Sequence, residues 1–510
     1  MILILDFGSQ YTQLIARRIR AFSVFSQIIP YSTPIDEIRA MNPTGIIFSG
    51  GPASVSAEGA PRVDPEILDL GVPILGICYG MQLLVHLLGG DVRAQSHSEY
   101  GRATMTHNST DVMLTDVPQT DVVWMSHMDA AVRLPQEWQT LASSEGCEQV
   151  IVRHTDRALY GLQFHPEVHH TPNGGQVLHN FVFEVCQSKA DWKIEDFIEK
   201  TVADIRAKLD AHPGSRIVCA VSGGVDSTVL AALLHRAAGD RLVPVFVDNG
   251  LLRAGEAEAV ERNFREHLDI NLKAVDARDL FLDALKGVTD PEQKRKIIGK
   301  LFIDVFYRTI QDGDFLAQGT LYPDVIESVS QKGPSDVIKT HHNRVEEVLR
   351  LMEQGLVIEP LAELFKDEVR VLGAQLGIPD EMLWRQPFPG PGLAVRVLGE
   401  ITAERLDILK KADKIVLDEA KAAGVYRSLW QSFAVLLPVK AVGVMGDTRT
   451  YANVIAVRAV ESVDAMTADF AKLPWDLLGR ISTRIINEVP GVNRVTYDIS
   501  SKPPATIEWE

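Results

Sequence analysis

Cys78 stands where a nucleophilic cysteine is expected, at a turn from a strand to a helix. The apolar run Pro73–Ile77 before it is typical of a buried strand, and apolar residues recur at helical spacing over Met81–Leu88. A helix N-terminus favours the thiolate form, which is the attacking species. A lone cysteine is more often a buried structural residue, but the small residues that flank this turn favour a nucleophile.

A nucleophilic cysteine needs a base and a group that orients the base. His165 and Glu167 follow an apolar strand, and residues two apart in an extended segment face the same side. Backbone N–H groups of the glycine turn that contains Gly51, together with that of Tyr79, are suited to an oxyanion hole. These residues predict an acyl-transfer site.

A second group of residues is suited to binding phosphate. The apolar run Arg216–Val221 predicts a buried strand, and Leu230–Ala237 predicts the helix that follows. The loop between them consists of Ser222, Gly223, Gly224, Val225, Asp226, Ser227 and Thr228. Its glycines, its hydroxyls and the helix N-terminus favour an anion, and a carboxylate such as that of Asp226 suits magnesium bound to phosphates.

The string S-G-G-V-D-S in this loop resembles the pyrophosphate-binding loop of the ATP pyrophosphatases. The Walker string with its lysine is absent from the sequence. The resemblance implies that ATP is split into AMP and pyrophosphate, and therefore that the protein adenylates an acceptor.

The strings F-S-G-G-P, L-G-I-C-Y-G-M-Q and F-H-P-E, in this order over residues 1–188, resemble the class I glutamine amidotransferases. The resemblance implies that Cys78 attacks the glutamine amide while His165 shuttles the proton and Glu167 holds His165. It also implies that Gly51 and Tyr79 stabilise the oxyanion. The residues that would position glutamine are Gln82, Ser126 and His127. The family usually reads S-H-G-D where this chain has Ser126-His127-Met128-Asp129, so the predicted glutamine loop departs from the family pattern at Met128.

The strands and helices that position these residues follow a pattern along the chain. This pattern predicts two open parallel-sheet α/β domains followed by a smaller α+β domain. Strand and helix patterns alternate through the first two thirds of the chain, whereas strand-like runs dominate the last hundred residues. With the two resemblances above, we expect an amidotransferase domain at 1–188, an ATP pyrophosphatase domain at 189–385 and a C-terminal domain at 386–510. We also expect Gln386–Arg396 to be a helix-free linker and the basic run Pro291–Lys296 to be a solvated helix face.

The amino-acid composition argues against some classes of protein. The chain has 510 residues, 46% hydrophobic and 23% charged, and a formal net charge of −17. This balance argues against a general nucleic-acid or membrane-surface binder. The four cysteines show no CxxC spacing, and the sequence carries neither a signal pattern nor an apolar run of membrane-spanning length. We therefore expect a cytoplasmic protein.

Over its whole length the chain is similar to the family of glutamine-hydrolysing GMP synthetases. The motifs that carry this resemblance are S-G-G-V-D-S, Y-P-D-V-I-E-S, L-F-K-D-E-V-R, F-P-G-P-G, V-G-V-M-G-D and the tail S-K-P-P-A-T-I-E-W-E. The resemblance implies that ATP adenylates XMP and that ammonia from glutamine displaces AMP to give GMP. Lys366 and Asp226 would act on ATP phosphates and Mg²⁺. Arg253, Lys502 and Glu508 would hold XMP. The resemblance also implies that residues 386–510 form the dimerisation and XMP-binding domain of a homodimer.

Two alternatives remain open at this point. Another ATP-dependent amidating or thiolating synthetase shares both modules, although the tail and F-P-G-P-G argue against it. A catalytically inactive scaffold is the other, although Cys78, His165, Glu167 and the unbroken loop argue against that. The family often reads H-H-N-V-G-G where this chain has His341-His342-Asn343 followed by Arg344-Val345-Glu346-Glu347, a region expected to move over the substrates.

Overall fold

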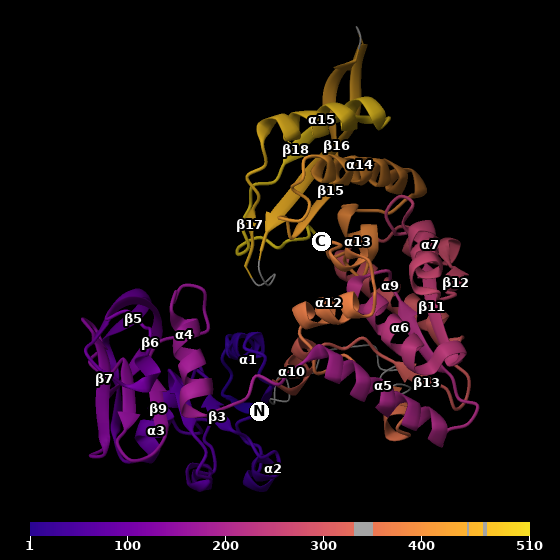
Figure 1. Ribbon diagram of the computed structural model, residues 1–510. Coiled ribbons are helices and arrows are strands. Elements are labelled where there is room, and N and C mark those ends of the chain that lie inside the picture. Colours follow the sequence, from indigo (N-terminus) through magenta and orange to yellow (C-terminus); the bar gives the residue numbers. More distant parts are fainter. Residues whose placement is uncertain (331–349, 446–447, 463–466) are drawn as a thin grey trace. The chain divides into compact units, whose positions relative to one another are not determined.

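Three sheets, of nine, five and four strands, organise the chain (Figure 1). The structure, a computed structural model, describes residues 1–330, 350–445, 448–462 and 467–510. They divide into two compact units, one formed by Met1–Asp196 with α10 (Tyr322–Ser330) and one by Phe197–Leu321 with the described residues from 350 onward. The segment around His341 and Arg344–Glu347 lies outside the described residues.

The nine-stranded sheet belongs to the first unit and has the strand order β2-β1-β3-β4-β9-β8-β7-β5-β6. Its strands are β1 (Ile2–Asp6), β2 (Ser26–Pro30), β3 (Gly45–Phe48), β4 (Ile74–Ile77), β5 (Asp91–His107), β6 (Thr120–Arg133), β7 (Trp138–Ser144), β8 (Ile151–His154) and β9 (Leu159–Leu162). The helices are α1 (Thr12–Ala21), α2 (Ile35–Ala40), α3 (Tyr79–Leu87) and α4 (Gly174–Asn180). From β2 to β9 the pairings are parallel, and from β9 to β6 they are antiparallel.

The five-stranded sheet of the second unit is parallel throughout, with the order β12-β11-β10-β13-β14. Its strands are β10 (Ile217–Val221), β11 (Leu242–Asp248), β12 (Lys273–Asp276), β13 (Phe315–Ala317) and β14 (Val357–Ile358). The helices are α5 (Ile194–Ala211), α6 (Val225–Ala238), α7 (Glu256–Leu268), α8 (Arg278–Leu285), α9 (Pro291–Tyr307), α12 (Lys366–Gln375) and α13 (Asp380–Leu383). Ligands bind at the carboxyl ends of strands in such sheets.

The four-stranded sheet, also in the second unit, is formed by β15 (Gln431–Met445), β16 (Thr448–Glu461), β17 (Asp469–Phe470) and β18 (Val492–Tyr497). Helices α14 (Ala403–Ala422) and α15 (Trp475–Glu488) lie side by side along it (Figure 1). The predicted fold class, parallel-rich α/β sheets followed by a smaller α+β part, is confirmed. The domain boundaries at 188 and 385 stay a prediction.

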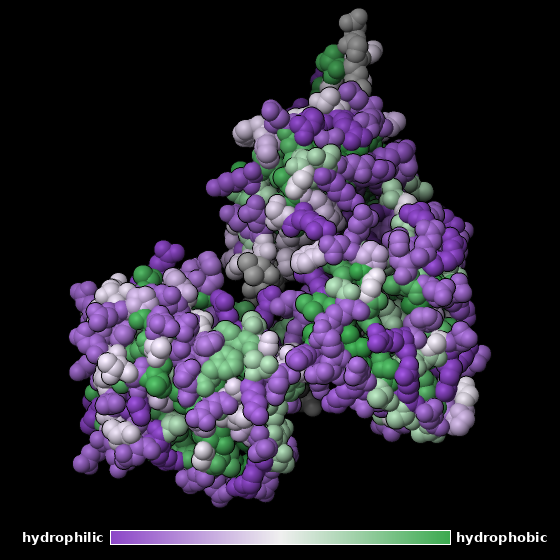
Figure 2. Space-filling view, viewed as in Figure 1, coloured by the Kyte–Doolittle hydropathy of each residue, from purple (hydrophilic) through white to green (hydrophobic). Residues whose placement is uncertain are grey.

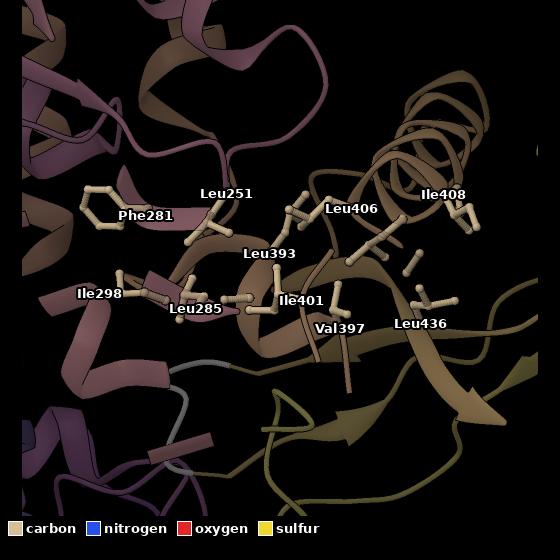
Figure 3. Packing of buried hydrophobic residues seen from close by; sticks show 14 of the residues in the cluster. Leu251, Phe281, Leu285, Ile298, Leu393, Val397, Ile401, Leu406, Ile408 and Leu436 are labelled. Carbon is tan, nitrogen blue, oxygen red and sulfur yellow. The ribbon is translucent and has the colours of Figure 1, made fainter. Parts of the chain in front are cut away.

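The expectation of a helix-free linker at Gln386–Arg396 is wrong. Its last five residues form a 3₁₀ helix, Gly392–Arg396, and all five are buried. Leu393 and Val397 pack in the main core of the second unit between Leu251 and the residues of α14 and β15 (Figure 3). The prolines and glycines permit this tight path, in which Gly392 has a φ of 63° and approaches the carbonyl of Leu251. The segment is therefore part of the core.

The expectation of a solvated face at Pro291–Lys296 is wrong for Lys294. This side chain is 0% exposed, and its ammonium donates to the carbonyl oxygens of Ala394 (3.3 Å) and Val397 (2.8 Å). It also forms an ion pair with the carboxylate of Glu510, at 2.5 Å. Because a buried charge is tolerated only when it is paired, Lys294 serves to hold the C-terminus in place.

Candidate active sites

The strand-to-helix turn at Cys78 is built by close backbone packing. Strand β4 ends at Ile77, helix α3 begins at Tyr79, and Cys78 has a φ of 48°. This angle lies in the left-handed region, where a residue with a side chain is strained, and such strain is typical of functional sites. A Cβ added to Gly80 would lie 2.3 Å from the carbonyl oxygen of Phe48, so only glycine fits there. The packing of α3 on β3 therefore maintains the turn.

Cys78, His165 and Glu167 form a continuous chain of contacts. Sγ of Cys78 lies 3.3 Å from Nε2 of His165, and Nδ1 of His165 lies 2.7 Å from Oε1 of Glu167. All three residues are buried. Burial by itself disfavours the imidazolium, but the negative charges of Cys78 and Glu167 outweigh it and raise the pKa of His165 well above its ordinary value. The arrangement suits a thiolate–imidazolium pair.

A cavity of about 490 Å³ opens beside Cys78, and its walls include Gly51, Tyr79 and His165. The N–H of Gly80 donates to the carbonyl of Ser49 at 3.2 Å, which ties the loop containing Gly51 to the start of α3. A Cβ on Gly51 would lie 2.7 Å from the carbonyl oxygen of Phe7, so the loop needs glycine to pack here. Gly51 and Tyr79 thus line the same cavity as Cys78, and their role as an oxyanion hole stays a prediction.

The residues predicted to position glutamine all line the same cavity: Gln82, Ser126 and His127. The side-chain amide of Gln82 donates to the carbonyl of Asp129 at 2.7 Å, and this hydrogen bond links α3 to strand β6. Burial lowers the pKa of His127 to about 4, so its ring is neutral at neutral pH. Met128, which stands where the family usually has glycine, also lines the cavity and is 61% exposed.

The second site lies at the carboxyl end of β10 in the second unit. A cavity of about 370 Å³ is lined by four residues of the predicted phosphate loop, Ser222, Gly224, Val225 and Asp226. The N–H of Gly224 donates to Oγ of Ser222 at 3.2 Å, and the hydroxyls of Ser222 and Ser227 lie 3.1 Å apart. The loop is thus folded on itself at the N-terminus of α6, which is the position that favours an anion.

The structure does not bring every loop residue to this cavity. Thr228 is buried, and its hydroxyl donates to the carbonyl of Gly224 at 2.8 Å. The hydroxyl of Ser227 donates to the same carbonyl at 3.1 Å. Gly223 has a φ of 75°, and a Cβ there would lie 2.5 Å from the side chain of Val260. Gly223, Ser227 and Thr228 therefore shape the loop instead of lining the cavity.

Lys366, the first residue of α12, lies across this cavity from the loop and forms an ion pair with Oδ2 of Asp226. Within the described residues, the buried Oδ1 of Asp226 has no hydrogen-bond partner. A carboxylate oxygen free to accept is the ligand type that Mg²⁺ prefers, so Asp226 fits the predicted magnesium ion bound with ATP. Lys366 provides a positive charge suited to a phosphate.

Arg253 and Glu508 belong to one buried group of charges around Phe388. Arg253 Nε lies 3.1 Å from Asp413, and the Arg253 guanidinium lies 5.0 Å from the ring centroid of Phe388, which lines the second cavity. Burial lowers the pKa of Arg253 despite Asp413. In the described part of the chain, Nη2 of Arg253 has no hydrogen-bond partner. Glu508 accepts two hydrogen bonds from Arg396, at 3.0 and 2.8 Å.

Lys502 lies in a C-terminal tail that is docked on the four-stranded sheet. Its N–H donates to the carbonyl of Ala468 at 2.7 Å, and its carbonyl accepts from the Ala468 N–H at 3.1 Å. Arg458, which is 0% exposed, donates to three tail carbonyls, those of Ser500, Thr506 and Ile507. Lys502 and Glu508 do not line the second cavity. Both residues belong to the second unit, which also contains this cavity.

Two arginines of the second cavity were given no role by the sequence analysis: Arg385 was missed, and Arg370 was noted only as the last residue of the motif L-F-K-D-E-V-R. Arg385 donates to the carbonyl of Gly223 at 2.9 Å and forms an ion pair with Glu256, and burial lowers its pKa to about 10. Arg370 lies 5.0 Å from the ring centroid of Trp384. A helical spacing of four from Lys366 places Arg370 on the same helix face, and this was the available signal. For Arg385 no motif gave one.

Comparison with known proteins identifies the family. The family "Glutamine amidotransferase class-I" matches residues 3–185, and the family "GMP synthase C terminal domain" matches residues 418–509. Three relatives named "GMP synthase [glutamine-hydrolyzing]" are similar over 100% of this chain and 99% of their own length. They are those of Aquifex aeolicus and Geobacillus kaustophilus, each 55% identical, and of Oleidesulfovibrio alaskensis, 54% identical. The chain therefore belongs to the family of glutamine-hydrolysing GMP synthases.

Proposed function

We propose that the first unit hydrolyses glutamine at Cys78. The Sγ thiolate attacks the side-chain amide carbon, and the imidazolium of His165 gives its proton to the leaving ammonia. Water then releases glutamate from the thioester, with His165 as the base and Glu167 holding its ring. The single observation that carries this proposal is the chain of contacts from Cys78 to Glu167 beside a cavity of suitable size.

The N–H groups of Gly51 and Tyr79 are proposed to stabilise the oxyanion that forms when Cys78 attacks. Preorganised donors of this kind contribute about 2.7–4 kcal/mol each in acyl-transfer enzymes. Gln82, Ser126 and His127 are proposed to orient the glutamine substrate, since all three line the cavity. The roles of these five residues rest on their shared placement around Cys78.

The second unit is proposed to adenylate XMP with ATP, which is the activation step that glutamine-dependent GMP synthesis needs. The oxygen at position two of the xanthine ring attacks the α-phosphate, and pyrophosphate leaves into the loop that begins at Ser222. Ammonia then displaces AMP to give GMP. The positive charge of Lys366 and the N-terminus of α6 support this placement of pyrophosphate. A Mg²⁺ ion held by Asp226 would neutralise phosphate charge when ATP is bound.

XMP itself is proposed to contact Arg253, Lys502 and Glu508. Support comes from the buried guanidinium of Arg253, which lies beside Phe388, a residue that lines the second cavity. Nη2 of this guanidinium has no hydrogen-bond partner among the described residues. The carboxylate of Glu508 belongs to the same group of charges through Arg396 and Asp413. A phosphate or a ring carbonyl of XMP would satisfy the orphaned donor on Arg253.

The proposed homodimer forms through the C-terminal sheet. The long hairpin of β15 and β16 exposes several apolar side chains: Val439, Val442, Val444 and Tyr451. Hydrophobic residues are visible on the surface of this hairpin in Figure 2. Exposed apolar groups gathered on one element are typical of a protein–protein interface.

A cytoplasmic location is also proposed. Among the described residues, no helix combines the length and the apolar character needed to cross a membrane. The substrates ATP, XMP and glutamine are small polar molecules, which suits this proposal.

The function is tested by pyrophosphate release with ATP, glutamine and a series of acceptors. We expect release only with XMP, in amounts equal to the GMP formed. Release that depends on a different carboxylate or carbonyl acceptor, with XMP inactive, would assign the adenylation site to another substrate.

A further inference from the structure

Three residues of the first unit form a cluster with the ligand types of a zinc site. They are Glu99 on β5, its cross-strand partner His127 on β6, and Cys147 in the turn that precedes β8. One ligand atom from each lies within 4.8 Å of the other two. The cluster is separate from the contact chain that joins Cys78, His165 and Glu167, and the proposed reaction does not use Glu99 or Cys147.

The side chains of this cluster make only part of the interactions that buried polar groups normally have. His127 is 7% exposed, and its ring meets the carboxylate of Glu99 and the backbone of Asp129 without a well-aligned hydrogen bond to either. Oε2 of Glu99 lies 3.4 Å from Nε2 of His127, and the Glu99 carboxylate also interacts with the side chain of Ser144. Long or poorly aligned contacts compensate only part of the cost of burying these groups, and a bound cation would complete their interactions.

The surrounding backbone holds the cluster in shape. The N–H of Cys147 donates to Oγ of Ser144 at 3.0 Å, and the N–H of Ser144 donates to the carbonyl of Cys147 at 2.7 Å. A Cβ on Gly146 would lie 2.7 Å from Oε1 of Glu99, so this glycine leaves room for the carboxylate. The side chain of Glu99 is 23% exposed, which gives an ion a route from solvent.

We propose that Glu99, His127 and Cys147 bind a Zn²⁺-class ion. A thiolate sulfur, an imidazole nitrogen and a carboxylate oxygen are all ligands that Zn²⁺ accepts, and tetrahedral coordination leaves one position for water. Mg²⁺ and Ca²⁺ take oxygen ligands and would not select this set. Binding displaces the thiol proton of Cys147 to solvent and forms the metal–sulfur bond.

The position of the site links it to glutamine binding. His127 belongs to the cluster and also lines the cavity beside Cys78, together with its neighbours Ser126 and Met128. An ion that fixes the ring of His127 therefore fixes one wall of that cavity. Bound metal is expected to stabilise the first unit and to change the KM for glutamine.

The test uses the full-length Cys78→Ala protein, which removes the catalytic thiol as a competing ligand. Titration with Co²⁺ is expected to give one equivalent of binding and a thiolate-to-cobalt charge-transfer band, which Zn²⁺ then displaces. The additional variant Cys147→Ser is expected to lose the band, and Glu99→Gln to bind Co²⁺ at least about tenfold more weakly. Cys186→Ser, which removes a buried thiol of the same unit outside the cluster, serves as the matched control.

Two results would overturn the proposal. One is absence of the band in the Cys78→Ala protein, which would make the cluster an ordinary buried group. The other is a band that persists unchanged in Cys147→Ser but disappears in Cys186→Ser, which would place the metal elsewhere. Glu99→Gln keeps the test open if Cys147→Ser does not fold, since an unchanged Co²⁺ affinity in Glu99→Gln also contradicts the site.

Discussion

Replacing Glu508 by alanine tests the account of the C-terminal tail. The carboxylate of Glu508 accepts from Nε and Nη2 of Arg396, at 3.0 and 2.8 Å, and from the amide of Gln431 at 3.2 Å. Arg396 is 0% exposed, whereas the Glu508 side chain is 18% exposed. After the change, Arg396 retains Asp413, at 3.8 Å, as its acidic partner among the described residues. The variant therefore leaves a buried guanidinium poorly compensated.

Loss of one partner from a buried ion pair costs about 3–5 kcal/mol. Because Glu508 is partly exposed, we expect the lower end, about 3 kcal/mol, for Glu508→Ala. The measurement is urea unfolding of the full chain without substrates, followed by tryptophan fluorescence and by loss of ammonium-dependent GMP synthesis. The KM for XMP, measured separately under native conditions, is expected to rise.

A matched control is Glu266→Ala, which removes an exposed glutamate of α7 in the same unit. Its free energy of unfolding is expected to stay within about 0.5 kcal/mol of the wild type. If Glu508→Ala unfolds at the same urea concentration as Glu266→Ala, the ion pair with Arg396 carries no stability and the reasoning is refuted.

Three further predictions concern the two sites. Gly80→Ala, whose Cβ would lie 2.3 Å from the Phe48 carbonyl, should destabilise the first unit by about 1–3 kcal/mol and reduce glutamate release. Glu167→Gln removes a charge that raises the pKa of His165, so the imidazolium should be lost at lower pH. The upper limb of the pH profile of glutamine hydrolysis should therefore shift to lower pH. Lys366→Ala should raise the KM for ATP in pyrophosphate release while glutamate release persists.

Each of these three predictions can be contradicted by a specific result. Full glutaminase activity and stability in Gly80→Ala would show that the turn at Cys78 tolerates a side chain. An unmoved upper limb in Glu167→Gln would mean that this carboxylate does not set the charge of His165. An unchanged KM for ATP in Lys366→Ala would remove this lysine from the ATP site.

Local patterns predicted the elements around the sites because short-range sequence specifies them. The strand predicted at Pro73–Ile77 contains β4, and the helical spacing predicted over Met81–Leu88 overlaps α3. The turn at Cys78 followed from a strand pattern that meets a helix pattern. The antiparallel extension from β9 to β6 was not predicted, since alternation of apolar residues does not specify which strand pairs with which.

Contacts between distant residues were beyond the sequence patterns. Lys294 is buried because it meets Glu510, 216 positions later, and a basic run gives no sign of such a partner. Arg385 reaches the phosphate loop through Gly223, which lies 162 positions earlier. In the same way, Thr228 has a hydroxyl that could bind a phosphate, but this hydroxyl donates to the carbonyl of Gly224 at the N-cap of α6. Residue type identified the candidate site residues. Only tertiary packing showed which of them line a site and which make other contacts.

The central claim is that Cys78 produces ammonia in one unit and that the loop beginning at Ser222 activates XMP in the other. The most direct measurement is GMP synthesis by the Cys78→Ala protein with either glutamine or ammonium as the nitrogen source. We predict that synthesis from glutamine is abolished, whereas synthesis from ammonium stays close to that of the wild type. Loss of both activities in a folded Cys78→Ala protein would contradict the division of the reaction between two sites.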